Sequence, residues 1–174
     1  MTNHSQRLGA PEWLILLGCI GFILVLAISA YFEPDIRALH FVQSWMYLAT
    51  AIFSLRGSRW GHFIGISAAG LWNYANLFAV SFFFNGLQQL AAWVRTGHLA
   101  RPDQFIAVPA WFSNLLVICG CLSAYSRRSD KRLSDGWKFL LVFALTTGFF
   151  ALDMALFQPR YLRIFPRLLH PHLP

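Results

Sequence analysis

The chain has 174 residues, of which 57% are apolar, 17% aromatic and 12% charged, and its formal net charge is +7. Soluble domains are about 45–50% apolar and about 25% charged, so this composition excludes an ordinary soluble protein, and it excludes disorder because disordered chains have low hydrophobicity. The basic residues lie mainly in short segments between apolar runs, where they orient helices and contact anionic lipid headgroups. We therefore expect one domain, an all-α polytopic helix bundle integral to a lipid bilayer, with no nucleic-acid partner.

Five windows of the chain are long and apolar enough to cross a bilayer, which requires about 20 residues of helix. They cover residues 13–32, 38–55, 60–84, 105–125 and 137–157. The first window carries no charge and is framed by Trp13 and Tyr31, as expected for aromatic belts at the two interfaces. Its apolar core is longer than that of a signal peptide, so we expect a retained helix.

The uncharged run from Trp60 to Val94 is too long for one straight span. As a single helix it would extend roughly 52 Å, whereas the bilayer core is about 30 Å thick. Asn85-Gly86 is a helix-breaking dipeptide, so we predict that the third span ends at Phe84. Residues 87–96 place apolar side chains along one helical face, which predicts a short interfacial helix. A re-entrant half-helix is the alternative.

The distribution of basic residues predicts the orientation. Five crossings place eight Lys and Arg residues on the side of the N-terminus and six on the other, which favours a cytoplasmic N-terminus, in a bacterial inner membrane, by the positive-inside rule. Residues 158–174 contain arginines at spacings of three and four and predict a basic amphipathic tail, which prefers an anionic leaflet. If this tail is cytoplasmic, one of the five spans is wrong.

The second span carries a stripe of polar residues. His40, Gln43, Tyr47, Thr50 and Ser54 recur at spacings of three and four, which places them on one helical face. Such a face must contact protein or water because lipid offers no hydrogen-bond partners. Packing between helices, with hydrogen bonds of roughly 0.6 kcal/mol each, is the simpler interpretation. The wall of a polar cavity is the alternative.

Two further sets of polar residues lie in the spans. The third span carries Asn73 and Asn76 among small residues, a composition that favours close helix packing. Asp153 is the only acidic residue inside a predicted span, and a carboxylate at the bilayer centre costs about 2.5–3.5 kcal/mol. A structural ion pair between Asp153 and Arg160 is the simpler interpretation. The topology also brings His40, His98 and Asp153 toward one membrane face, where they would relay protons or bind a metal.

Motifs for catalysis and metal binding are missing from the sequence. No HxxxH, HExxH or CxxC spacing occurs, and such spacings are what metal and redox motifs require. His40 and His62 begin consecutive antiparallel spans, so they lie at opposite membrane faces and do not ligate one haem. We expect no catalytic residues, no metal site and no bound cofactor.

These patterns predict a small non-catalytic accessory or scaffold subunit of a membrane complex, with protein partners or further copies of itself in the bilayer. One alternative is a small transporter or permeability protein that uses the second-span stripe and Asp153. Another is a quinone- or haem-binding redox subunit. The candidate ligand-binding residues are His40, Gln43, Tyr47, Thr50, Asn73, Asn76, His98 and Asp153.

Overall fold

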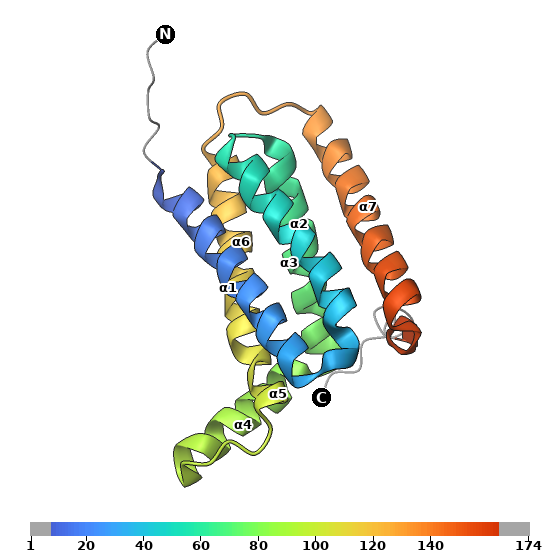
Figure 1. Ribbon diagram of the computed structural model, residues 1–174. Helices are drawn as coiled ribbons and strands as arrows, with labels where there is room; N and C mark the ends of the chain where they lie inside the picture. The colour runs from blue at the N-terminus through green and yellow to red at the C-terminus, as the bar shows by residue number, and fades with distance from the viewer. Residues whose placement is uncertain (1–7, 164–174) are drawn as a thin grey trace.

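A computed structural model describes residues 8–163 as a bundle of long helices (Figure 1). Four helical segments are long and apolar enough to cross a membrane, and a bent pair of helices provides up to one more. This confirms the all-α fold class and is compatible with an integral membrane protein. The single helices are α1 (Ala10–Phe32), α2 (Arg37–Leu55), α6 (Ala107–Ser126) and α7 (Ser134–Phe157). Most of the predicted basic tail, residues 164–174, lies outside the described residues.

The most extensive helix contact is that of α1 with α6, which are far apart in the sequence. Glycines on both helices make this approach possible. A Cβ atom on Gly18 would lie 2.7 Å from the backbone oxygen of Ser113, and one on Gly120 would lie 2.9 Å from that of Pro11. Small residues at the contact allow two backbones to approach in this way. The pair forms one side of the bundle (Figure 1).

The centre of the bundle is aromatic. Phe22 of α1 stacks on Tyr47 of α2, with ring centroids 4.2 Å apart, and meets Trp72 of α3 (Arg59–Tyr74) edge-on at 4.9 Å. Phe22 and Tyr47 have no solvent exposure. Stacked and edge-to-face rings are worth about 0.5–1.5 kcal/mol beyond their buried area. The side chain of Phe22 therefore packs α1 against both α2 and α3.

The third predicted span ends earlier than the sequence suggested. α3 continues into a π-helical segment, η2 (Ala75–Ala79), and the chain then breaks at Val80 and Ser81 before α4 (Phe82–Thr96) leaves at 72°. Ser81 is left-handed, with φ of 55°. Gly86, expected to break the helix, instead lies inside α4, where its missing side chain lets the backbone oxygen of Gln104 approach. In the structure the break after the third predicted span therefore lies at Val80 and not at the predicted Phe84.

Ion pairs join the loops at the end of the bundle near residue 8. Arg59 reaches Asp135 at 2.6 Å and Asp130 at 2.6 Å, and Arg128 donates to the backbone oxygen of Gly57. Arg128 also pairs with Asp130 and lowers the pKa of that carboxyl. Because Asp135 is only 3% exposed, this network fixes the α2–α3 turn against the start of α7.

A candidate ligand-binding cavity

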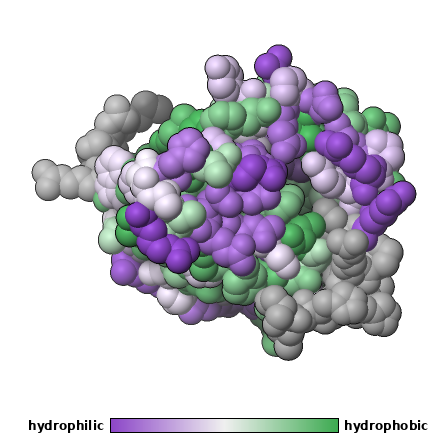
Figure 2. Space-filling view, turned by 90° about the horizontal axis from the view of Figure 1, so that it is seen from below, coloured by the Kyte–Doolittle hydropathy of each residue, from purple (hydrophilic) through white to green (hydrophobic). Residues whose placement is uncertain are grey.

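A cavity of about 280 Å³ opens at the opposite end of the bundle, where α1 meets α2. Its walls come from α1, the short η1 (Pro34–Ile36), α2, α3, η2, α4, the short α5 (Pro102–Phe105), α6, α7 and η3 (Pro159–Arg163). Hydrophilic side chains gather across the middle of this end of the molecule (Figure 2). The volume is near the lower limit of small-molecule pockets, which are roughly 300–1,000 Å³.

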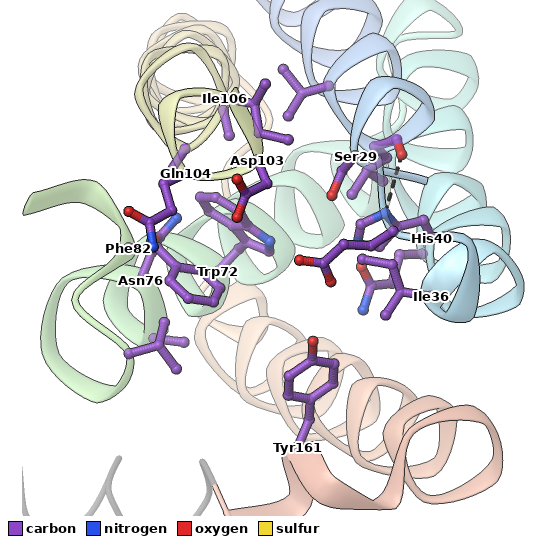
Figure 3. A pocket seen from close by; sticks show the side chains of 18 of the residues that line it. Ser29, Ile36, His40, Trp72, Asn76, Phe82, Asp103, Gln104, Ile106 and Tyr161 are labelled. Carbon is purple, nitrogen blue, oxygen red and sulfur yellow. Dashed lines mark hydrogen bonds between the residues drawn. The ribbon is translucent and has the colours of Figure 1, made fainter. Parts of the chain in front are cut away.

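His40 forms one polar wall of the cavity (Figure 3). It lies in the first turn of α2, and its Nδ1 is 3.1 Å from the backbone oxygen of Leu26 in α1. A carbonyl oxygen only accepts hydrogen bonds, so Nδ1 carries the hydrogen. In the neutral ring, Nε2 is then an acceptor. His40 therefore offers the cavity a lone pair whose direction is fixed by the α1–α2 contact.

Asn76 forms the opposite wall, on the π-helical segment η2 (Figure 3). Its side chain is 2% exposed, and neither its amide nitrogen nor its amide oxygen has a hydrogen-bond partner. An unsatisfied buried polar group costs about 1–3 kcal/mol. Short π-helical segments inside α-helices are frequent at functional sites. The cavity thus contains one donor and one acceptor that the fold itself leaves unused.

Three charged residues, called the rim below, also line the cavity. Arg101 forms a forked ion pair with Asp103, with N–O distances of 3.1 and 2.8 Å, and this pairing raises the pKa of Arg101. Glu33 also lines the cavity. With both carboxylates ionised, the formal charge of these three residues is −1. The rim therefore does not favour a negatively charged ligand.

The polar stripe of α2 has two parts with different environments. His40 and Gln43 line the cavity. Beyond them, the hydroxyl of Tyr47 donates to Oδ1 of Asn114 in α6 at 2.7 Å, and Thr50 donates to a backbone oxygen of its own helix at 2.8 Å. Ser54 is buried as well. Packing between helices therefore describes the stripe from Tyr47 to Ser54, and the wall of a cavity describes His40 and Gln43.

Asp153 is buried beside the cavity without lining it. It is 2% exposed, both carboxylate oxygens lack a well-formed hydrogen bond, and Gln43 is the side chain that interacts with it. The ion pair expected with Arg160 is not formed among residues 8–163. The guanidinium of Arg160 instead lies 5.1 Å from the ring centre of Tyr161, because the chain turns away from α7 at Gln158 and Pro159.

The other candidate residues do not join the cavity. Asn73, one turn before Asn76, is buried and donates to the backbone oxygen of Trp111 at 3.4 Å. His98 is exposed in the loop after α4. His40, His98 and Asp153 therefore do not converge on one point. Within the described part of the chain, no group of three or more metal-ligating side chains is found.

Sequence reasoning overlooked several residues that line the cavity, among them Trp72, Gln104 and Tyr161. Trp72 lies inside a predicted span and resembles an ordinary apolar packing residue, while Gln104 and Tyr161 lie in the short helical segments α5 and η3. The one available signal was topological, since several polar residues near helix ends share one membrane face.

No protein-family model matches the chain, and no curated protein or solved structure is similar enough to match it.

Proposed function

We propose that this protein is a non-catalytic membrane subunit that binds a small amphipathic molecule in the cavity between His40 and Asn76. The observation that carries the proposal is the unpartnered amide of Asn76, which lies in a cavity wall at 2% exposure. Buried polar groups are nearly always hydrogen-bonded. Departures from that rule tend to occur at functional sites, and a ligand would supply the missing partners.

The surroundings of the cavity support an amphipathic ligand. Trp72, Phe82 and Phe150 provide apolar surface, and His40, Gln43 and Asn76 provide hydrogen-bonding groups. Ligand pockets characteristically combine mainly apolar walls with a few well-placed polar groups. Tyr47, one turn after Gln43 in α2, is hydrogen-bonded to Asn114. This packed contact favours a binding site at one end of the bundle and argues against a polar path across it.

The orientation and the partners belong to the same proposal. We propose a bacterial inner membrane, a cytoplasmic N-terminus and a cavity near the outer surface, because most basic loop residues lie at the end that carries Arg59 and Arg128. The subunit role is tested by purification from native membranes in mild detergent, with intact sizing and mass spectrometry. Reproducible stoichiometric protein partners would support the subunit role. A lone chain would refute the subunit role and leave ligand binding to its own test.

Ligand binding is tested with 4-decylphenol as an uncharged amphipathic probe. The protein is reconstituted in nanodiscs, and binding is followed by isothermal titration calorimetry. We expect saturable binding to the wild type and weaker binding to Asn76→Leu, by roughly 2- to 12-fold for one lost hydrogen bond of about 0.5–1.5 kcal/mol. Asn73→Leu is the matched control, since Asn73 is a buried asparagine on the preceding turn that does not line the cavity. Equal affinity for the wild type and Asn76→Leu would refute the site.

A further inference from the structure

We infer, on the basis of the proposed function, that the cavity takes the head group of a lipid-soluble quinol: an uncharged ring with oxygen atoms at opposite edges. The inference names the ligand class of the same cavity. It rests on the charge of the rim, on the hydrogen-bonding groups of two opposite walls, and on the aromatic surface between them. It concerns binding and includes no electron-transfer step.

The net charge of the rim disfavours an acidic head group. Among the described residues that line the cavity, Arg101 is the one lysine or arginine, and its Nε and Nη2 donate to the carboxylate of Asp103. Glu33 adds a further carboxylate. A fatty acid or a lipid phosphate would meet the net negative charge of these three residues, whereas an uncharged ring meets no such repulsion.

The hydrogen-bonding groups require polar atoms at two edges of the ligand. His40 Nε2 accepts, because Nδ1 donates to the carbonyl of Leu26. Asn76 offers a donor at Nδ2 and an acceptor at Oδ1. The two side chains lie on opposite sides of the cavity, with the ring of Trp72 drawn between them (Figure 3). A quinol hydroxyl at one edge donates to His40, and the oxygen at the other edge accepts from Asn76.

The same geometry predicts which redox form binds more tightly. A quinone carries carbonyl oxygens, which accept but do not donate. It can accept from Asn76, but it has nothing to donate to His40 Nε2. A quinol satisfies both walls, so it should bind more tightly than the corresponding quinone.

Aromatic side chains favour a flat head group. Trp72 and Phe82 lie beside Asn76 in the cavity wall (Figure 3), and Trp72 is held in place by its edge-on contact with Phe22. Aromatic rings pack against flat rings by offset stacking or edge-to-face contact. A volume of about 280 Å³ accommodates one substituted six-membered ring, and the alkyl tail would extend out of the opening.

The inference is tested by comparing four decyl-chain probes on the full-length protein in zwitterionic nanodiscs, under anaerobic conditions. The probes are decylbenzoquinol, decylbenzoquinone, 4-decylphenol and decanoate. We expect the quinol to bind best, roughly 2- to 12-fold more tightly than the phenol or the quinone, because each lacks one hydrogen bond. His40→Phe should reduce the preference for the quinol over the quinone, because only the quinol donates to His40. Asn76→Leu should reduce the preference for the quinol over the phenol, which has one oxygen atom. Asn73→Leu should retain both preferences. Thermal unfolding confirms that each variant is folded.

The outcomes separate this inference from the proposed function. If the quinol, the quinone and the phenol bind equally and Asn76→Leu weakens all three, the quinol assignment is wrong and the amphiphile site stands. If decanoate binds best, the charge argument is wrong. If no probe binds the wild type, both the assignment and the proposed function fail. A quinol-over-quinone preference that persists in His40→Phe, or a quinol-over-phenol preference that persists in Asn76→Leu, would also overturn the assignment.

Discussion

Replacing Asn76 with leucine should stabilise the ligand-free protein while weakening its site. Leucine is similar in shape to asparagine and has no polar atoms. The amide of Asn76 is buried and unpartnered at both of its polar atoms, so its removal recovers a desolvation penalty of about 1–3 kcal/mol. For a chain of this length each kcal/mol corresponds to roughly 2–4 °C, so the midpoint should rise by roughly 2–12 °C.

The assay is thermal unfolding in one detergent, followed by circular dichroism for the wild type and two variants. Asn114→Leu is the contrasting variant, because Asn114 accepts a 2.7 Å hydrogen bond from Tyr47 and neither side chain has any solvent exposure. Its loss leaves the hydroxyl of Tyr47 unpaired, so the midpoint should fall. The same substitution thus acts in opposite directions at two buried asparagines.

A lower or unchanged midpoint for Asn76→Leu would refute this reasoning. It would mean that the amide is satisfied in the folded protein, for example by ordered water in the cavity, and the main support for the ligand site would be lost. A raised midpoint for Asn76→Leu, together with a smaller stabilisation of this variant by added quinol, would support both the unpartnered amide and the ligand site. Stabilisation by a ligand grows as RT ln(1 + [L]/Kd), so a weaker site gives a smaller shift at the same concentration.

Three other perturbations test the fold. Gly120→Val should disrupt the α1–α6 contact and lower the midpoint strongly, because a Cβ there meets backbone atoms at 2.9 Å, whereas Gly70→Ala, with open space around it, should be tolerated. Asp135→Asn should lower the free energy of unfolding in denaturant titrations, because Arg59 loses the charge of a partner at 2.6 Å; an unchanged free energy of unfolding would contradict this. In a variant without native cysteines, an impermeant maleimide should label Ser129→Cys and His98→Cys from opposite sides of the membrane; labelling from one side would refute five crossings.

Composition and helix length were sufficient to predict the bundle, because a membrane permits few backbone structures. The bend between α3 and α4 was misplaced because two tertiary effects compete with the local signal. Ser81 adopts a left-handed backbone conformation that a serine does not predict. Gly86 lies inside a helix, where it allows the backbone of Gln104 to approach closely. An Asn-Gly pair therefore need not break a helix where another segment packs against the glycine.

The site was predictable only in part. The periodicity of α2 places His40 and Gln43 on an inward face, but it does not say where packed side chains end and a cavity begins. That boundary is set by Asn114, which fills the space beside Tyr47. Trp72 and Tyr161 enter the site from helices that become neighbours only after the bundle has closed.

The contact between α1 and α6 has a consequence for biogenesis. Gly18 and Gly120 are separated by about 100 residues, so at a synthesis rate of roughly 5–20 residues per second the first helix waits about 5–20 s for its main partner. During that time its glycine-notched face is covered by lipid, a translocon or a chaperone. The cavity beside it cannot take shape until nearly the whole chain has left the ribosome.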